Sequence, residues 1–129
     1  MALIPTLTIK DTTTFSDTID FSVTDTLTVA SPAQAVSLVT VTTTGGNHII
    51  LPNVDAKRYL YVKHLGVATL GGSAVTTTLA VETADNTAVI TLAAGEWMFA
   101  PIHDGDATLI QLQASGSTIV AEYAYWTAG

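Results

Sequence analysis

The chain has 129 residues, of which 48% are hydrophobic and only 12% charged, with a formal net charge of −7 and no cysteine. This length and composition exclude two independent cores, a disordered chain, thiol chemistry and any need for a metal or disulfide staple. The charge excludes a free-standing nucleic-acid binder, because only Lys10, Lys57, Arg58 and Lys63 could supply a basic face.

Residues 1–18 differ from the rest of the chain. Leu3, Leu7 and Ile9 occupy odd-numbered positions and are followed by a Thr-rich run. One interpretation is a first strand at the edge of the domain's own sheet. The other is an extended arm that adds to the sheet edge of a neighbouring subunit, with these three residues as its contacts.

The stretch "IDFSVTDTLTV" at 19–29 alternates apolar and polar residues. Successive side chains of a strand point to opposite faces, so this pattern predicts one long strand with a single buried face. Asp25 interrupts the apolar face and indicates a bulge or a sheet edge at that point.

Short runs rich in Thr and Val follow, separated by turns that contain Gly, Asn or Asp. They predict strands at 35–43, 48–51, 58–65, 73–82, 87–92, 96–102, 107–114 and 118–126. About eight or nine strands spaced about ten residues apart, with no helix, are typical of a sandwich or barrel. We therefore expect an all-β, antiparallel β-sandwich of the jelly-roll type, with an immunoglobulin-like sandwich as the alternative. Residues 19–129 would form this single domain, and residues 1–18 the arm or edge strand.

The stretch "AAGEWMFAPIHDGDA" at 93–107 gathers Glu96, His103, Asp104 and Asp106. A glycosidase needs two carboxylates close together, but Glu96 and Asp104 lie at opposite ends of a strand about 20 Å long. The start "DGD" fits a helix–loop–helix calcium loop, but the later ligand positions do not.

The segment is therefore expected to be a turn, a strand and a turn, with Trp97 and Phe99 packing inward and Pro101 marking a sheet edge. His48, His64 and His103 lack metal-ligand spacing, and no nucleophile or phosphate-loop motif is present. We expect no catalytic residue, metal or cofactor, and hence no enzyme.

Aromatic residues could form a sugar-binding platform, if they do not simply pack within the sandwich. The candidates are Trp97, Tyr59, Tyr61, Tyr123, Tyr125 and Trp126. Tyr125 and Trp126 could equally seal a subunit interface. Lys57 and Arg58, beside Lys63, form either a solvated strand edge or a docking point for an acidic partner.

The C-terminal half resembles small virion proteins of tailed bacteriophages. The resemblance covers residues 58–126 and is carried by "RYLYVKHLGVATLGG", "LAAGEWMFAPI" and "ATLIQLQASGSTIVAEYAYW". In such proteins a "YVKN"-like strand precedes a polar hairpin, an L-x-x-G-E-x-x-x-x-P segment and an ending that contains E-Y. The N-terminal half is similar only in being extended and rich in Thr.

The resemblance implies a capsid decoration, or cement, protein. Such proteins are β-rich, often trimeric, and bind the outer capsid where major capsid subunits meet. The expected partners are the major capsid protein and further copies of the chain, most simply in a trimer, with neither nucleic acid nor membrane.

The expected location is the capsid surface of the virion, after synthesis in the host cytoplasm. The N-terminus has neither the cationic start nor the apolar run of a secretory signal, and no segment reaches the length of a membrane span. A carbohydrate-binding or adhesin module on a tail or fibre is the alternative function. A small cupin-like enzyme would need a His-rich metal cluster, which the sequence lacks.

Overall fold

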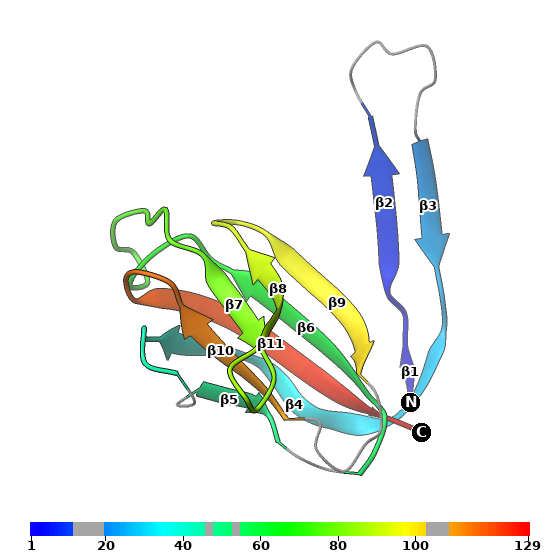
Figure 1. Ribbon diagram of the computed structural model, residues 1–129. Coiled ribbons are helices and arrows are strands. Elements are labelled where there is room, and N and C mark those ends of the chain that lie inside the picture. Colours follow the sequence, from blue (N-terminus) through cyan, green and yellow to red (C-terminus); the bar gives the residue numbers. More distant parts are fainter. Residues whose placement is uncertain (12–19, 46–47, 53–54, 103–108) are drawn as a thin grey trace.

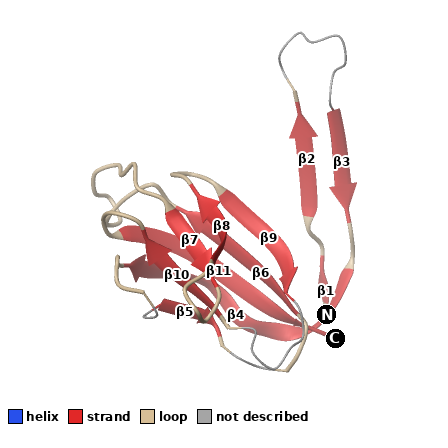
Figure 2. Cartoon of the chain, viewed as in Figure 1, coloured by secondary structure: helices blue, strands red, loops and turns tan. Residues whose placement is uncertain are grey.

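The computed structural model describes residues 1–11, 20–45, 48–52, 55–102 and 109–129. These residues form strands, turns and loops, with no helix (Figure 2). The strands are β1 (Ala2–Leu3), β2 (Thr6–Lys10), β3 (Asp20–Thr24), β4 (Leu27–Val41), β5 (His48–Leu51), β6 (Arg58–His64), β7 (Leu79–Glu82), β8 (Ala88–Leu92), β9 (Trp97–Ile102), β10 (Ile110–Ala114) and β11 (Ile119–Ala128). No helix in this part of the chain could cross a membrane.

Two antiparallel sheets pack face to face, as the strand pattern predicts (Figure 1). The larger sheet has five strands in the order β1-β4-β11-β6-β9, and the smaller has four in the order β5-β10-β7-β8. Apolar side chains from both sheets form the core between them, and several are completely buried, among them Leu51, Leu60, Leu79, Leu112 and Ile119. The protein is therefore an all-β antiparallel sandwich. The finer choice between jelly-roll-like and immunoglobulin-like stays a prediction.

Strand β6 shows how the sequence pattern assigns the two faces of the larger sheet. Leu60 and Val62 are fully buried in the core. Tyr59 and Tyr61 alternate with them and point to the outer face, as the alternation predicts.

Strands β2 and β3 form a separate two-stranded sheet that projects from the sandwich beside β9 (Figure 1). We call this pair, residues 6–10 and 20–24, the arm. Strand β1 precedes it and pairs with β4, through Ala2 with Thr28 and Leu3 with Leu27. The N-terminal segment thus contains both a short edge strand of the domain's own sheet and one strand of a projecting element. Residues 12–18 of the predicted arm lie outside the described part.

The expectation of one long strand at 19–29 with a buried face is wrong. The chain leaves β3 at Thr24 and begins β4 at Leu27, and every residue of β3 is exposed. Asp25 does interrupt the pattern, because it lies between the two strands and its backbone N–H donates to Pro5 O at 3.2 Å. The strand predicted at 73–82 is also shorter than expected, since regular pairing begins only at Leu79.

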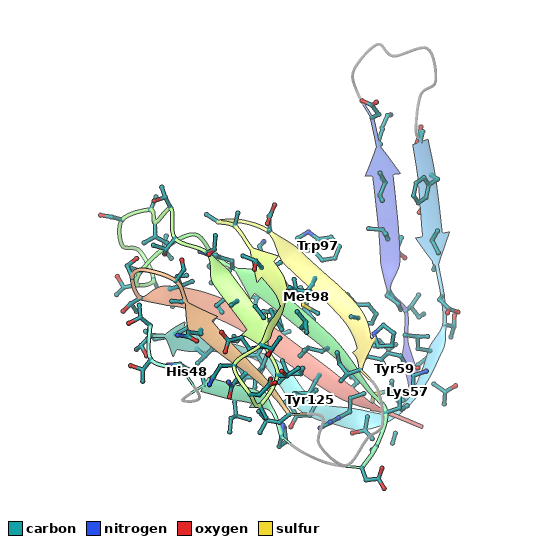
Figure 3. The ribbon with its side chains drawn as sticks, in the orientation of Figure 1. His48, Lys57, Tyr59, Trp97, Met98 and Tyr125 are labelled. Carbon is teal, nitrogen blue, oxygen red and sulfur yellow. The ribbon has the colours of Figure 1, made fainter. Side chains whose placement is uncertain are left out.

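The predicted inward packing of Trp97 and Phe99 is also wrong. Met98 of β9 is buried, whereas Trp97 is 51% exposed and points away from the core (Figure 3). In register, Phe99 lies opposite Tyr61 and Trp97 opposite Lys63, so both share the outer face with the tyrosines. Strand β9 lies at the end of the five-stranded order, and Pro101 therefore does mark a sheet edge.

Candidate functional site

The arm has one apolar face, which we call the apolar strip: Leu7, Ile9, Phe21 and Val23. The register places Leu7 opposite Val23 and Ile9 opposite Phe21, so all four side chains share one face of the two-stranded sheet. Their exposures are 41%, 42%, 45% and 55% in the order Leu7, Ile9, Phe21 and Val23. A contiguous apolar strip this exposed is typical of an interaction site.

The opposite face of the arm is polar and pairs within itself. The hydroxyl oxygens of Thr6 and Thr24 lie 3.0 Å apart, and Thr8 Oγ1 donates to Ser22 Oγ at 3.2 Å. Lys10 Nζ lies 4.0 Å from Asp20 Oδ2 at the end of the arm. These cross-strand pairs support the register of β2 and β3, so the strip is one face of a regular two-stranded sheet.

The outer face of β6 and β9 carries four aromatic side chains, which we call the aromatic wall: Tyr59, Tyr61, Trp97 and Phe99. The Tyr59 and Phe99 rings stack, with centroids 6.2 Å apart and planes 8° from parallel. Lys57 Nζ lies over the Tyr59 ring, 5.7 Å from its centroid. Three of these residues are among the predicted platform aromatics, and the structure brings them together with Phe99.

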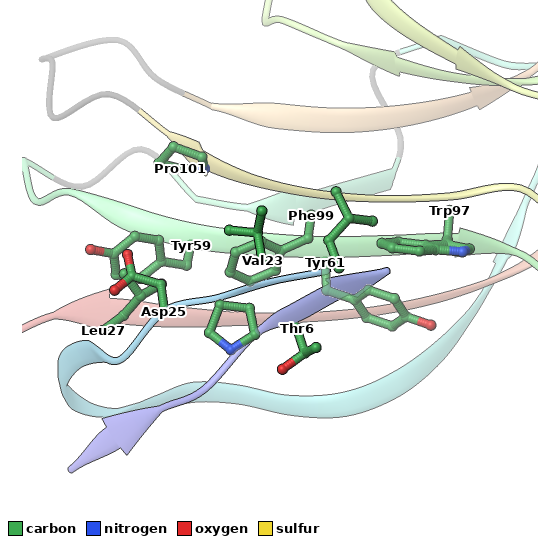
Figure 4. Close-up of a pocket in the computed structure, with 11 residues that line it drawn as sticks. Thr6, Val23, Asp25, Leu27, Tyr59, Tyr61, Trp97, Phe99 and Pro101 are labelled. Carbon is green, nitrogen blue, oxygen red and sulfur yellow. The ribbon is translucent and has the colours of Figure 1, made fainter. Parts of the chain in front are cut away.

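A cavity of about 560 Å³ separates the base of the arm from the aromatic wall (Figure 4). Its arm side includes Leu7 and Val23, and its sheet side includes the whole wall. Thr6 and Asp25 also belong to the lining, although the Thr6 hydroxyl pairs with that of Thr24 on the polar face of the arm. This volume falls in the range of ligand sites, and the mainly apolar lining suits either an apolar side chain or the carbon-bound face of a sugar.

Tyr61 connects the wall to β11. Its hydroxyl donates to Glu122 Oε1 at 2.8 Å. Burial, and then the hydrogen bond and charge of Glu122, raise the pKa of Tyr61 to about 12, because ionisation would place a phenolate beside a carboxylate.

We expect alkaline pH to destabilise the wild-type protein more than a Tyr61→Phe variant. The folded-state pKa of Tyr61 is about 12, above its unfolded value of about 10, so its stabilisation is complete below pH about 10 and lost as pH rises through about 12. Urea unfolding at about pH 9 and about pH 11 measures this difference, and the other tyrosines, present in both proteins, cancel. If the difference in free energy of unfolding between the two proteins did not change with pH, ionisation of Tyr61 would not be coupled to folding.

The predicted interface residues fall in four places. Leu7 and Ile9 lie on the apolar strip, and Leu3 lies in β1, half-buried. Lys57 is exposed beside the wall, and Trp126 lies opposite Tyr59 on the outer face.

Arg58 and Tyr125 lie on the inner side of the larger sheet. Arg58 is only 2% exposed, and its Nη1 donates to Pro52 O. Tyr125 packs against the core opposite Leu60. The structure therefore places Leu7 and Ile9 on the exposed arm and Lys57 on the surface beside the wall, and it separates Arg58 and Tyr125 from these surfaces.

The candidates for acid–base or metal chemistry do not converge within the described residues. Glu96 lies in a turn where Gly95 adopts a φ of 85°, and its Oε2 accepts the Ala93 N–H at 2.7 Å. His103, Asp104 and Asp106 lie outside the described part. No three His, Asp or Glu side chains of that part gather into a group that could hold a metal ion.

Phe21, Val23 and Phe99 are the residues of the candidate site that the sequence prediction missed. The alternation around Phe21 and Val23 predicted the buried face of one long strand, while residues 1–18 were predicted to be either an edge strand or an arm. Two amphipathic strands on either side of a Thr-rich run were the signal for one projecting pair.

Comparison with protein-family models and with curated proteins finds no match for this sequence. The function must therefore be inferred from the arm, the wall and the motifs in residues 58–126.

Proposed function

We propose that this chain is a structural protein of a tailed-bacteriophage virion, most specifically a capsid decoration protein. In this role it binds the outer surface of the capsid, stabilises contacts between major capsid subunits and acts as a homo-oligomer, with a trimer as the simplest form. It works by contact and carries out no catalysis. The supporting observation is the projecting arm, whose apolar strip is exposed in the single chain and supplies an attachment surface.

Two further features fit an assembly role. The sandwich is a compact body with two of its edges formed by the short strands β1 and β5, and the arm is its only described element that leaves this body (Figure 1). The motifs at 58–126 resemble those of phage virion proteins, and they build β6, β9 and β11, which support the wall.

Removal of residues 1–18 is expected to leave a folded sandwich that binds capsids at least about tenfold more weakly. The core cluster begins at Val41, so no core side chain is lost, while the strip loses Leu7 and Ile9. A tenfold loss corresponds to about 1.4 kcal/mol of binding free energy. Co-sedimentation with capsids that lack their decoration protein measures the effect, and thermal unfolding reports on the fold.

Val89→Ser is the matched control for this truncation. Val89 is an apolar residue, 57% exposed, on β8 of the other sheet, and its replacement is expected to leave capsid binding unchanged. Full occupancy of capsids by the truncated chain would refute an attachment role for the arm.

A second candidate is a carbohydrate-binding module on a tail or fibre. The observation that favours it is the cavity, whose lining combines the aromatic wall with the acidic residue Asp25. Aromatic faces stack on sugars while such polar groups bind their hydroxyls. Immunogold labelling on the tail, together with glycan binding that is lost in Trp97→Ala, would establish this function in place of the first.

A further inference from the structure

We infer that the apolar strip on the arm of one copy packs against the aromatic wall of a second copy of this chain. Each copy gives its arm and receives another, so the assembly closes as a dimer or a ring. The inference rests on the assembly role proposed above and names the partner of its arm. Its test needs only the purified chain, so failure of self-association and failure of capsid binding are observed separately.

The amount of exposed surface is the first argument. A compact monomer of 13.4 kDa exposes about 6,500 Å². This chain exposes 7253 Å², which is about 750 Å² more. One partner in a stable interface of standard size buries about 800 Å², so an excess of this size is enough surface for one share of such an interface.

Neither the strip nor the wall is fully covered in the single chain. A two-stranded sheet is marginal in water unless its apolar face is covered, and Ile9 and Phe21 lie outside the lining of the chain's own cavity. Trp97 of the wall is 51% exposed. Between them lies a cavity of about 560 Å³, far from the close packing of a finished interface.

A second copy of the chain fits these surfaces because its wall can cover the strip and its strip can cover the wall. The strip is uncharged, as is the wall, so their burial leaves no charge unpaired. At the rim of the wall lie two of the four basic residues of the chain: Lys57 over Tyr59 and Lys63 opposite Trp97. A positive rim favours an acidic partner, and a copy of this chain has a net charge of −7.

The reach of the arm reduces repulsion between the acidic sandwiches. Five residues of strand span about 17 Å, about twice the screening length of about 8 Å at physiological ionic strength. Exchange also needs little rearrangement, because Ile4 and Pro5 on one side and Asp25 and Thr26 on the other connect the arm outside any strand. Exchange of an identical element is a common route to oligomers.

Sedimentation velocity of the purified chain tests the inference. We expect an oligomer for the wild type, and a folded monomer for Phe21→Asp, which places a charge in the strip. Ser22→Asp adds the same charge one residue away on the polar face and is expected to remain oligomeric. A monomeric wild type, or equal behaviour of the two variants, would overturn the inference.

Trp97 distinguishes strip-on-wall contact from association of arms with each other. In a Trp126→Phe background, Trp97 is the only indole, and its emission should shift to shorter wavelength as the oligomer forms. Trp97→Ala should be monomeric, and mixing it with Phe21→Asp should restore association, because one intact strip then meets one intact wall. An oligomeric Trp97→Ala, or a glycan that binds the wall of the wild-type oligomer, would refute this packing.

Discussion

Leu60→Ala is expected to lower the free energy of unfolding by about 4 kcal/mol. Leu60 is fully buried in β6, between β11 and β9, and packs in the core shared by both sheets. Its register neighbours are Tyr125 and Ala100, which are held in place by the pairing of their strands with β6 and cannot move in to fill the space. Against a total stability of about 5–15 kcal/mol for such a domain, this single loss is large. Urea unfolding at neutral pH measures it.

Leu38→Ala is the matched control for this prediction. Leu38 lies in β4 of the same sheet but on the outer face, where it is 48% exposed. The same atoms are removed there from a site open to water, so we expect a loss below about 1 kcal/mol. Similar losses at the two positions would mean that the core does not lie where β6 places it.

The faces of β6 could be predicted from the sequence because its two sets of side chains differ in kind. Leu60 and Val62 are aliphatic, whereas Tyr59 and Tyr61 end in hydroxyls that need water or a partner. The alternation of side chains along β6 then assigns both faces of the strand. The class of fold follows for the same reason, since most strands show such a contrast and none shows a helical period.

The faces of β9 could not be predicted in this way. Trp97, Phe99 and Pro101 alternate with Met98, Ala100 and Ile102, and both sets are apolar. Alternation separates the sets but does not say which one meets the core. The register with β6 decides it, because Phe99 lies opposite Tyr61, and this tertiary fact sends the larger aromatic residues outward.

The arm shows a second limit of prediction from sequence. The pattern in β3 correctly places Phe21 and Val23 on one face, but an apolar face covered by the same chain and one left open have the same alternation. The site was therefore predicted only in parts. Leu7, Ile9, Tyr59, Tyr61 and Trp97 were candidates, whereas the cavity, which all of these except Ile9 line, depends on where the arm leaves the sandwich.

His64→Leu is expected to cost about 3 kcal/mol, because it removes partners from two backbone groups. His64 is fully buried at the end of β6. The Gly66 N–H donates to Nδ1 at 2.9 Å, so Nδ1 is the acceptor and Nε2 carries the hydrogen that it donates to Thr77 O at 2.9 Å. The ring thus connects the sheet to two loop segments, and leucine fills most of its volume while leaving both groups unpaired.

Two further substitutions separate the lost hydrogen bonds from the lost packing. Asparagine at 64 can keep an acceptor near the Nδ1 position, so His64→Asn should cost less than His64→Leu. His48→Leu removes a ring whose Nε2 accepts the Thr42 N–H at 3.1 Å at a half-buried site, and water can replace that bond, so its loss should stay near about 1 kcal/mol. Urea unfolding of the three variants gives the order of their losses in stability. If His48→Leu were as destabilising as His64→Leu, burial of the unpaired groups would not be the cause.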